Sequence, residues 1–335
     1  MDIKTAQEVL ACLPVGKTPF YYCKDRYAVF LLSQVIGRQC AIAELKKSAY
    51  SGLLHKPLVK DVLAQSGDGQ LRQEHLGLAW GSRTEAFLLT LGIWGDKDRS
   101  WDQVSRNGYS LVLQLNFSNK HDSVFKRLAE PGEYHQFNCL MHPVLKRQQR
   151  GFFRETLAWA RIDFDFNTNE ALIEELQTDW LRRAKRLLGE IQSGKTRFFN
   201  LGANAKPEKL RRYLEAVLAD YGDIWDEALL TAALQFIRQE LGIAKIYLHT
   251  PETGGAIKRI KYTQPPRSLY SSLPRKFCFR QTDKAPEFLQ QHRTFRKLEK
   301  RLGGTQWHVI NLGGNNADIT GTAAQKSGRP VTLAA

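Results

Sequence analysis

The residues best placed to do chemistry lie in one short stretch, EALIEELQTDW at 170–180. Glu175, Gln177 and Asp179 are spaced two apart there, and on a β-strand this spacing puts all three on one face. Two carboxylates and an amide on one face are costly to bury unless they are paired. The face is therefore either a solvated or ion-paired structural surface, or the wall of a pocket where Glu175 or Asp179 acts as a general base.

Three further residues are predicted, with Gln177, to bind substrate. Asn116 closes an apolar stretch at 109–117, His249 lies at the end of another at 244–250, and Trp180 follows the polar triplet directly. Pockets often lie at strand ends, and we expect a turn at PETGG, 251–255, after the second of these strands.

No metal site is expected. His121, His135 and His142 lie close together in the sequence with Cys139. No two of the three histidines have the i, i+4 spacing that places two histidine ligands on one helix. Capping or core roles suit these histidines better.

A second polar feature is the segment 255–301, which holds thirteen lysines and arginines against three acidic residues, with aromatic residues interleaved. Such a mixture suits phosphate contacts and base stacking. The alternative is a solvated basic face whose aromatic residues lie in the core. The predicted phosphate or nucleic-acid contacts are Lys258, Arg259, Lys261, Arg267, Arg275 and Lys276.

Residues 187–199 contain Gly189, Gly194, Lys195 and Thr196 at the spacing of a phosphate-binding P-loop. A working P-loop follows a buried strand and opens a helix. Here a basic amphipathic stretch precedes the first glycine, and Gly202 and Pro207 follow soon after the threonine. We therefore interpret the match as a helix end followed by a polar loop, and we do not expect ATP to bind there.

The surrounding pattern predicts the elements that must position these residues. Alternating apolar residues favour a hairpin over 156–178, and a 3.6-residue period favours three helices between about 180 and 242. Further strands are expected at 87–94, 109–117, 136–141, 244–250 and 305–312. A last helix is expected at 286–302.

The expected fold class is mixed α/β, with a mostly antiparallel central sheet flanked by helices. The predicted organisation has three parts. They are a helical N-terminal portion at 1–80, a mixed α/β domain at 81–312, and a disordered tail at 313–335, which has almost no large apolar residues.

The composition limits the class of protein. The 335 residues are 42% hydrophobic, which suits a packed core, and the net charge of +15 favours polyanionic partners. Five scattered cysteines with no C-x-x-C pair predict reduced thiols and a cytoplasmic location. No signal peptide and no run of 18 apolar residues are present, so no membrane association is expected. The oligomeric state is left open.

The motif ELQTDW resembles an E-[IL]-Q-[ST]-D-W block of large polyvalent proteins from phages and conjugative elements. The similarity covers about 170–280 and includes Trp225, Glu227, Gly242 and the stretch SLYSSLPRKFCF. It implies a relationship with mobile elements, without a settled activity to carry over.

The order of elements from the hairpin to SLYSSLPRKFCF also looks like the second half of a GNAT-type N-acyltransferase. In that family a late tyrosine protonates the departing CoA thiolate, and Tyr270 and Phe279 match the positions of this tyrosine and of a following phenylalanine. The resemblance implies an acetyl-CoA-dependent group transfer with Tyr270 as a catalytic residue. The stretch QTDWLRRAKRLLGE lacks the R/Q-x-x-G-x-G/A loop that holds the CoA pyrophosphate in that family.

Two functional hypotheses result, beside the third possibility of a structural or interaction protein of a mobile element. The first is a group-transfer enzyme, GNAT-like, that acts on a phosphorylated or nucleic-acid-linked substrate at the polar triplet. The alternative is a non-catalytic nucleic-acid-binding module that uses the basic segment 255–301.

Overall fold

The computed structural model describes residues 1–12, 18–96, 103–132, 135–146, 153–194, 204–260 and 264–313. The chain forms two compact units. The larger unit combines Met1–Tyr27 with Trp80–Leu312, and the smaller one is Ala28–Ala79. Nearly all of the predicted tail lies outside the described residues.

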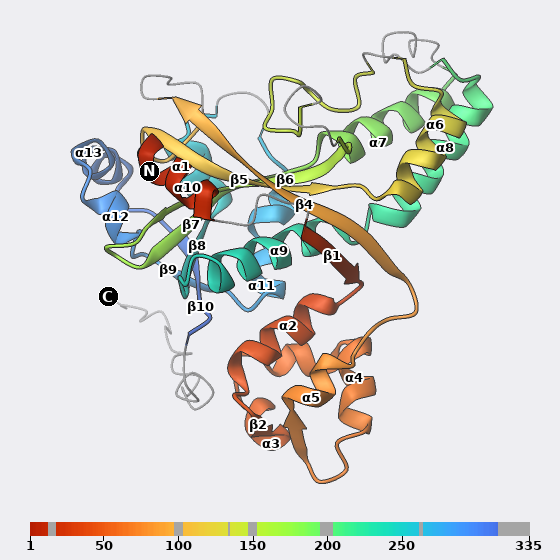
Figure 1. Ribbon diagram of the computed structural model, residues 1–335. Helices are drawn as coiled ribbons and strands as arrows, with labels where there is room; N and C mark the ends of the chain where they lie inside the picture. Colours follow the sequence, from red (N-terminus) through yellow and green to blue (C-terminus); the bar gives the residue numbers. More distant parts are fainter. Residues whose placement is uncertain are drawn as a thin grey trace, which may run out of the picture. The chain divides into compact units, whose positions relative to one another are not determined.

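An eight-stranded sheet organises the larger unit (Figure 1). Its only parallel pair among the described strands is β7 with β8, and all other neighbours run antiparallel. The expected mixed, mostly antiparallel sheet is therefore confirmed. In spatial order the strands are β1 (Thr18–Cys23), β4 (Thr84–Asp96), β5 (Gly108–Asn116), β6 (Thr156–Asp165), β7 (Glu170–Gln177), β8 (Lys245–His249), β10 (Trp307–Asn311) and β9 (Arg280–Thr282).

Three long helices connect β7 to β8, as a parallel pair requires a crossover connection. They are α7 (Asp179–Gln192), α8 (Pro207–Tyr221) and α9 (Trp225–Gln239). α9 packs on β6 and β7, while α8 contacts α7 and α6 (Asn119–Ala129). The remaining helical elements of the larger unit are α1 (Ile3–Cys12), α10 (Pro251–Ile257), η4 (Arg267–Tyr270), α11 (Ser272–Lys276), α12 (Glu287–Gln290) and α13 (Arg293–Leu302).

The parallel pair separates before β7 ends. Its pairing with β8 runs from Glu170 to Ile173 and stops there. The rest of β7 stays paired with β6 on the other side, so residues 174–177 have a free edge toward the chain that follows β8. The segments after β8 supply the groups that cover this edge, including the side chains of Lys258 and Tyr270.

The smaller unit is built from short elements around its own apolar core. The buried core residues include Leu31, Leu32, Val59 and Leu71. The elements are α2 (Arg26–Val35), whose first two residues belong to the larger unit, β2 (Gln39–Ala41), α3 (Ile42–Leu45), η1 (Ser51–His55), α4 (Pro57–Ala64), β3 (Gln70–Arg72) and α5 (Gln73–Gly77). A two-stranded sheet, β2 with β3, accompanies the helices.

The structure divides the N-terminal region differently from the predicted helical portion at 1–80. Residues 1–27 belong with the large sheet because β1 pairs with β4 along its whole length, and α1 packs on β4 and β5. Residues 28–79 are mainly helical, as predicted, apart from the two short strands β2 and β3. This boundary is decided by strand pairing between segments that are distant in the sequence. The local periodicity of the sequence therefore does not predict it.

Two local expectations are wrong. Residues 136–141 form no strand, and the backbone N–H of Cys139 donates to the carboxylate of Asp179, so it has no strand partner. PETGG is the start of α10 and not a turn, because Thr250 caps the helix by accepting a hydrogen bond from the Thr253 N–H, and Pro251 is tolerated in the first turn.

Candidate functional site

A small cavity lies at the free edge of β7, and we call it the strand-edge pocket. Its lining includes five of the residues predicted from sequence, which come from β7, the end of β8, the C-cap of α10 and η4: Glu175, Gln177, His249, Lys258 and Tyr270. Its volume is about 80 Å³. The pocket therefore has room for a reactive group of a few atoms rather than for a whole cofactor.

Glu175 is ion-paired in this pocket. The Arg161 guanidinium donates to its Oε2 through Nε at 2.8 Å and through Nη2 at 2.5 Å, and Nη2 also donates to the carbonyl of Gln103. Oε2 of Glu175 is therefore part of an ion pair, which is the structural alternative to a catalytic role for this polar face. Oε1 has no hydrogen-bond partner within the described part of the chain.

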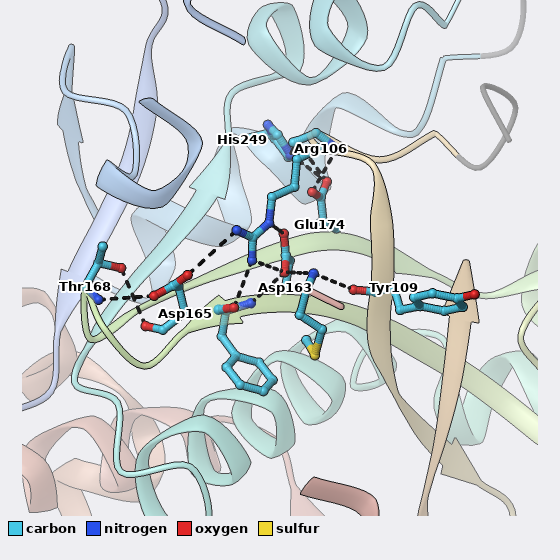
Figure 2. Close-up of polar contacts among 10 residues, drawn as sticks. Arg106, Tyr109, Asp163, Asp165, Thr168, Glu174 and His249 are labelled. Carbon is cyan, nitrogen blue, oxygen red and sulfur yellow. Dashed lines mark hydrogen bonds and ion pairs between the residues drawn. The ribbon is translucent and has the colours of Figure 1, made fainter. Parts of the chain in front are cut away.

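A buried polar cluster lies beside Glu175, where the β6–β7 pairing is irregular and passes over Glu174. The Glu174 carboxylate is 0% exposed and contacts His249 Nε2 at 3.1 Å and the Lys258 ammonium at 3.3 Å. The hydroxyl of Ser105 donates to Glu174 Oε2 at 3.0 Å and lies 3.1 Å from His249 Nε2. Figure 2 shows Glu174 and His249 side by side, with one imidazole nitrogen toward the carboxylate and the other turned away.

Burial and charge fix the protonation of this cluster. Burial would raise the pKa of Glu174, but the Lys258 charge and the His249 hydrogen bond outweigh it and hold that pKa well below its ordinary value. Burial and the Lys258 charge lower the pKa of His249 to about 4. His249 is therefore neutral at physiological pH. Burial also lowers the pKa of Lys258 from its ordinary value.

The tautomer of His249 follows from its partners. An ionised carboxylate only accepts hydrogen bonds, so Nε2 carries the proton that is donated to Glu174. Nδ1 then carries a lone pair, and this buried nitrogen has no hydrogen-bond partner among the described residues. A buried polar atom without a partner costs about 1–3 kcal/mol, so this nitrogen is a candidate contact for a ligand.

Tyr270 provides a proton donor in the same pocket. Its hydroxyl accepts a hydrogen bond from the Leu176 N–H at 3.3 Å, on the free edge of β7. Burial and the neighbouring charge of Glu175 raise the pKa of Tyr270 above its ordinary value. The hydroxyl thus keeps its proton at neutral pH and can donate it to a ligand.

The spacing predicts Asp179 on the same strand as Glu175 and Gln177, but the structure does not place it there. β7 ends at Gln177, and Asp179 is the first residue of α7. Its buried carboxylate accepts from His142 at 2.6 Å, from Gln177 at 2.8 Å and from Arg182 at 2.8 Å. Burial opposes ionisation, but these hydrogen bonds lower the pKa of Asp179 below its ordinary value. The carboxylate therefore serves as an anchor for its neighbours.

Trp180 and Asn116 lie away from the pocket lining. The Trp180 indole is fully buried among aromatic rings, stacks on Phe137 at 4.9 Å and donates to the Tyr213 hydroxyl at 2.7 Å. The Asn116 side chain donates to Thr90 and accepts from Thr156, both at 2.8 Å. Both side chains are thus engaged in internal contacts.

The predicted phosphate-contacting residues differ in their environments. Lys258 is buried in the cluster described above, and Lys276 is half-buried and paired with the buried carboxylate of Glu227. Arg267 is exposed and pairs with Glu252 at 2.5 Å. Arg259 and Arg275 are exposed, and Lys261 lies outside the described residues.

The P-loop-like spacing falls at the end of a helix. Gly189 lies inside α7, which continues to Gln192, so no strand leads into this segment. Lys195 and Thr196 lie outside the described residues.

Over the described part of the chain, no group of three or more His, Cys, Asp or Glu side chains is arranged to hold a metal ion. The helices described here include none that combines the length and apolar character needed to cross a bilayer. Comparisons with protein-family models, with curated proteins and with solved structures find no match.

Proposed function

We propose that this protein is a group-transfer enzyme that moves an acyl group from a thioester donor to an amine in the strand-edge pocket. The observation that carries the proposal is the pairing of two complementary groups in one small cavity. His249 offers a neutral imidazole whose Nδ1 has no hydrogen-bond partner among the described residues, and Tyr270 offers a buried hydroxyl that holds its proton.

Each group has one task in such a transfer. The amine nitrogen forms a bond to the thioester carbonyl carbon while the C–S bond breaks. His249 accepts the proton that the amine loses, at Nδ1, and Tyr270 donates its hydroxyl proton to the departing thiolate. Glu174 holds the imidazole in the required tautomer through the hydrogen bond at Nε2.

The start of α7 does not fit the phosphates of an acyl-CoA. In the GNAT family that we expect this chain to resemble, the pyrophosphate lies at the helix that follows the corresponding strand. Here Asp179 puts a buried negative charge at that point, and its repulsion opposes a phosphate there. The proposal therefore places only the thioester end of the donor in the strand-edge pocket. A group of this size suits the pocket volume of about 80 Å³.

The test is release of free thiol from acetyl-CoA with a panel of primary amines, using wild type, His249→Gln and Tyr270→Phe. We expect turnover in the wild type and a loss of about 10²-fold or more in each variant, as is typical when a general acid or base is removed. Arg211→Gln, an exposed substitution on α8, is the control. Wild-type rates in both pocket variants would refute the proposal.

A second candidate function is nucleic-acid binding, favoured by the charge on α13. This helix carries Arg293, Arg296 and Lys300, all exposed and without an ion-pair partner within the described residues. These three side chains share one helix face by their spacing. We expect binding of a labelled oligonucleotide to weaken steeply with salt, and Arg293→Ala/Arg296→Ala/Lys300→Ala should flatten that dependence. Affinity that does not change with salt would exclude this function.

A further inference from the structure

A larger concave site adjoins the strand-edge pocket. It lies between the end of α10 and α13, and we call it the α10–α13 groove. Its volume is about 550 Å³, which lies in the range typical of small-molecule sites. Gln103 and Lys258 line both the groove and the strand-edge pocket.

The groove is positively charged and has no acidic residue in its described lining. The charges of two of its cations are neutralised by carboxylates that do not line the groove. Arg106 pairs with Asp163 at 2.6 Å (Figure 2), and Lys258 pairs with Glu174. Three other cations are exposed and have no hydrogen-bond or ion-pair partner within the described chain: Arg259, Lys297 and Arg301. Among the described residues, the groove therefore has a positive charge that no acidic side chain compensates.

The two walls place these three cations around an apolar floor. Lys297 and Arg301 are four residues apart on α13, so they lie on one helix face. Arg259 follows α10 on the opposite wall. Ile257 and Phe295 are buried between the walls. Cations around an apolar floor suit a ligand that combines phosphate groups with a flat or aliphatic part.

Arg259 occupies a backbone position that glycine adopts more easily. It follows the last turn of α10 with φ = 54°, in the left-handed region that disfavours side chains bearing a Cβ. An arginine at this position therefore carries a local conformational cost. Substitution by glycine would remove the cation and relieve that cost, which makes Arg259→Gly a variant that should not unfold the protein.

We propose that the α10–α13 groove binds an organic phosphate of nucleotide size. Arg259, Lys297 and Arg301 contact its phosphates, and Ile257 and Phe295 contact its apolar part. Through the shared Gln103 and Lys258, the ligand extends from the groove toward the strand-edge pocket. This last connection rests on the proposed function, and the binding itself does not.

The test compares two triple variants that lose the same charge. Arg259→Gly/Lys297→Ala/Arg301→Ala removes the groove cations, and Arg293→Ala/Arg296→Ala/Lys300→Ala removes three cations from the neighbouring face of α13. Calorimetry with CoA, ATP, inorganic phosphate and a single-stranded oligonucleotide is performed at one salt concentration. We expect CoA or ATP to bind the wild type, with a loss of more than about tenfold in the groove variant and less than about threefold in the control.

Three results would overturn the inference. They are the absence of binding by both CoA and ATP at millimolar concentration, equal losses in the two variants, and binding of the oligonucleotide alone. His249→Gln and Tyr270→Phe separate this inference from the proposed function. If they bind the organic phosphate normally while no protein releases thiol, the groove stands and the transferase proposal fails. If thiol release persists unchanged in the groove variant, the connection between the groove and the strand-edge pocket fails, and the transferase proposal is unaffected.

Discussion

At the scale of single residues, Glu174 and His249 determine each other's protonation. The carboxylate keeps the Nε2 proton in place, and Lys258 supplies the positive charge that keeps Glu174 ionised in a buried site. The ring of Trp307 is tilted against the imidazole, with the two ring centroids 4.9 Å apart, and helps to exclude water. Such a cluster ties the stability of the fold to pH.

The first prediction concerns that pH dependence. The pKa of His249 is about 4 in the folded chain, against an ordinary value of 6.5, so protons bind the unfolded chain more readily between these values. The stability that the neutral imidazole contributes is present above pH 6.5 and is lost as the pH falls toward 4. At 1.36 kcal/mol per pKa unit the loss amounts to about 3 kcal/mol.

Urea unfolding from about pH 7 to about pH 4 measures this loss. Other buried histidines, such as His121 and His308, also have lowered pKa values, so the comparison is between wild type and His249→Gln. The free energy of unfolding should fall less steeply in the variant. Equal slopes in the two proteins would contradict the assigned protonation of His249.

Glu174 belongs to this cluster but is not among the residues predicted from the spacing of Glu175, Gln177 and Asp179. Strict alternation predicts Glu175 and Gln177 on one face of β7 and Leu172, Glu174 and Leu176 on the other. In the structure the β6–β7 pairing shifts register at this point and passes over Glu174, so the alternation does not continue through it. A lone carboxylate at an expected apolar position is the signal that the sequence contains. Its partners His249 and Lys258 were predicted as site residues, but separately, because only the crossover brings them to β7.

At the scale of elements, the long periodic segments were predictable. The hairpin of β6 and β7, the helices α7, α8 and α9, and the strand β8 follow the expected periods. Short elements were not predictable, because tertiary contacts and caps decide them. α10 depends on the Thr250 cap, and residues 136–141 are held by Asp179 instead of a strand partner.

The second prediction tests the role of Asp179 at the start of α7. Its carboxylate joins this helix to the segment that contains Cys139 and His142. Asp179→Ala leaves these donors without their acceptor, and we expect a loss of roughly 2–3 kcal/mol in the free energy of unfolding.

The control for this substitution is Glu190→Ala on the same helix, where the surface pair with Arg186 should contribute less than about 0.5 kcal/mol. Thiol release per folded molecule should not change in Asp179→Ala. A stable variant that loses turnover would instead support the catalytic role considered for Asp179 from the sequence.

At the scale of the whole molecule, the smaller unit is an insertion in the larger one. The chain leaves the sheet after β1 and returns at β4, and Cys23 and Thr84 near these two points are direct partners in the sheet. The two ends of the insertion are therefore held close together by strand pairing. The smaller unit also has a buried core of its own.

The third prediction follows from this arrangement. A protein in which a short Gly-Ser linker replaces residues 28–79 should retain a single cooperative unfolding transition of the larger unit. Closing a shorter loop lowers the entropic cost of pairing β1 with β4. Thermal unfolding followed by near-ultraviolet circular dichroism measures this. Loss of the cooperative transition would show that the sheet depends on the insertion.

The position of β10 has a consequence for how the chain is synthesised. This strand pairs with both β8 and β9, yet it is the last element of the described chain. While the ribosome adds residues from the N-terminus, β8 keeps one unpaired edge until β10 has emerged, although its other neighbour, β7, is already available. Because unpaired strand edges promote association between chains, the nascent chain is most exposed to aggregation in the interval between β8 and β10.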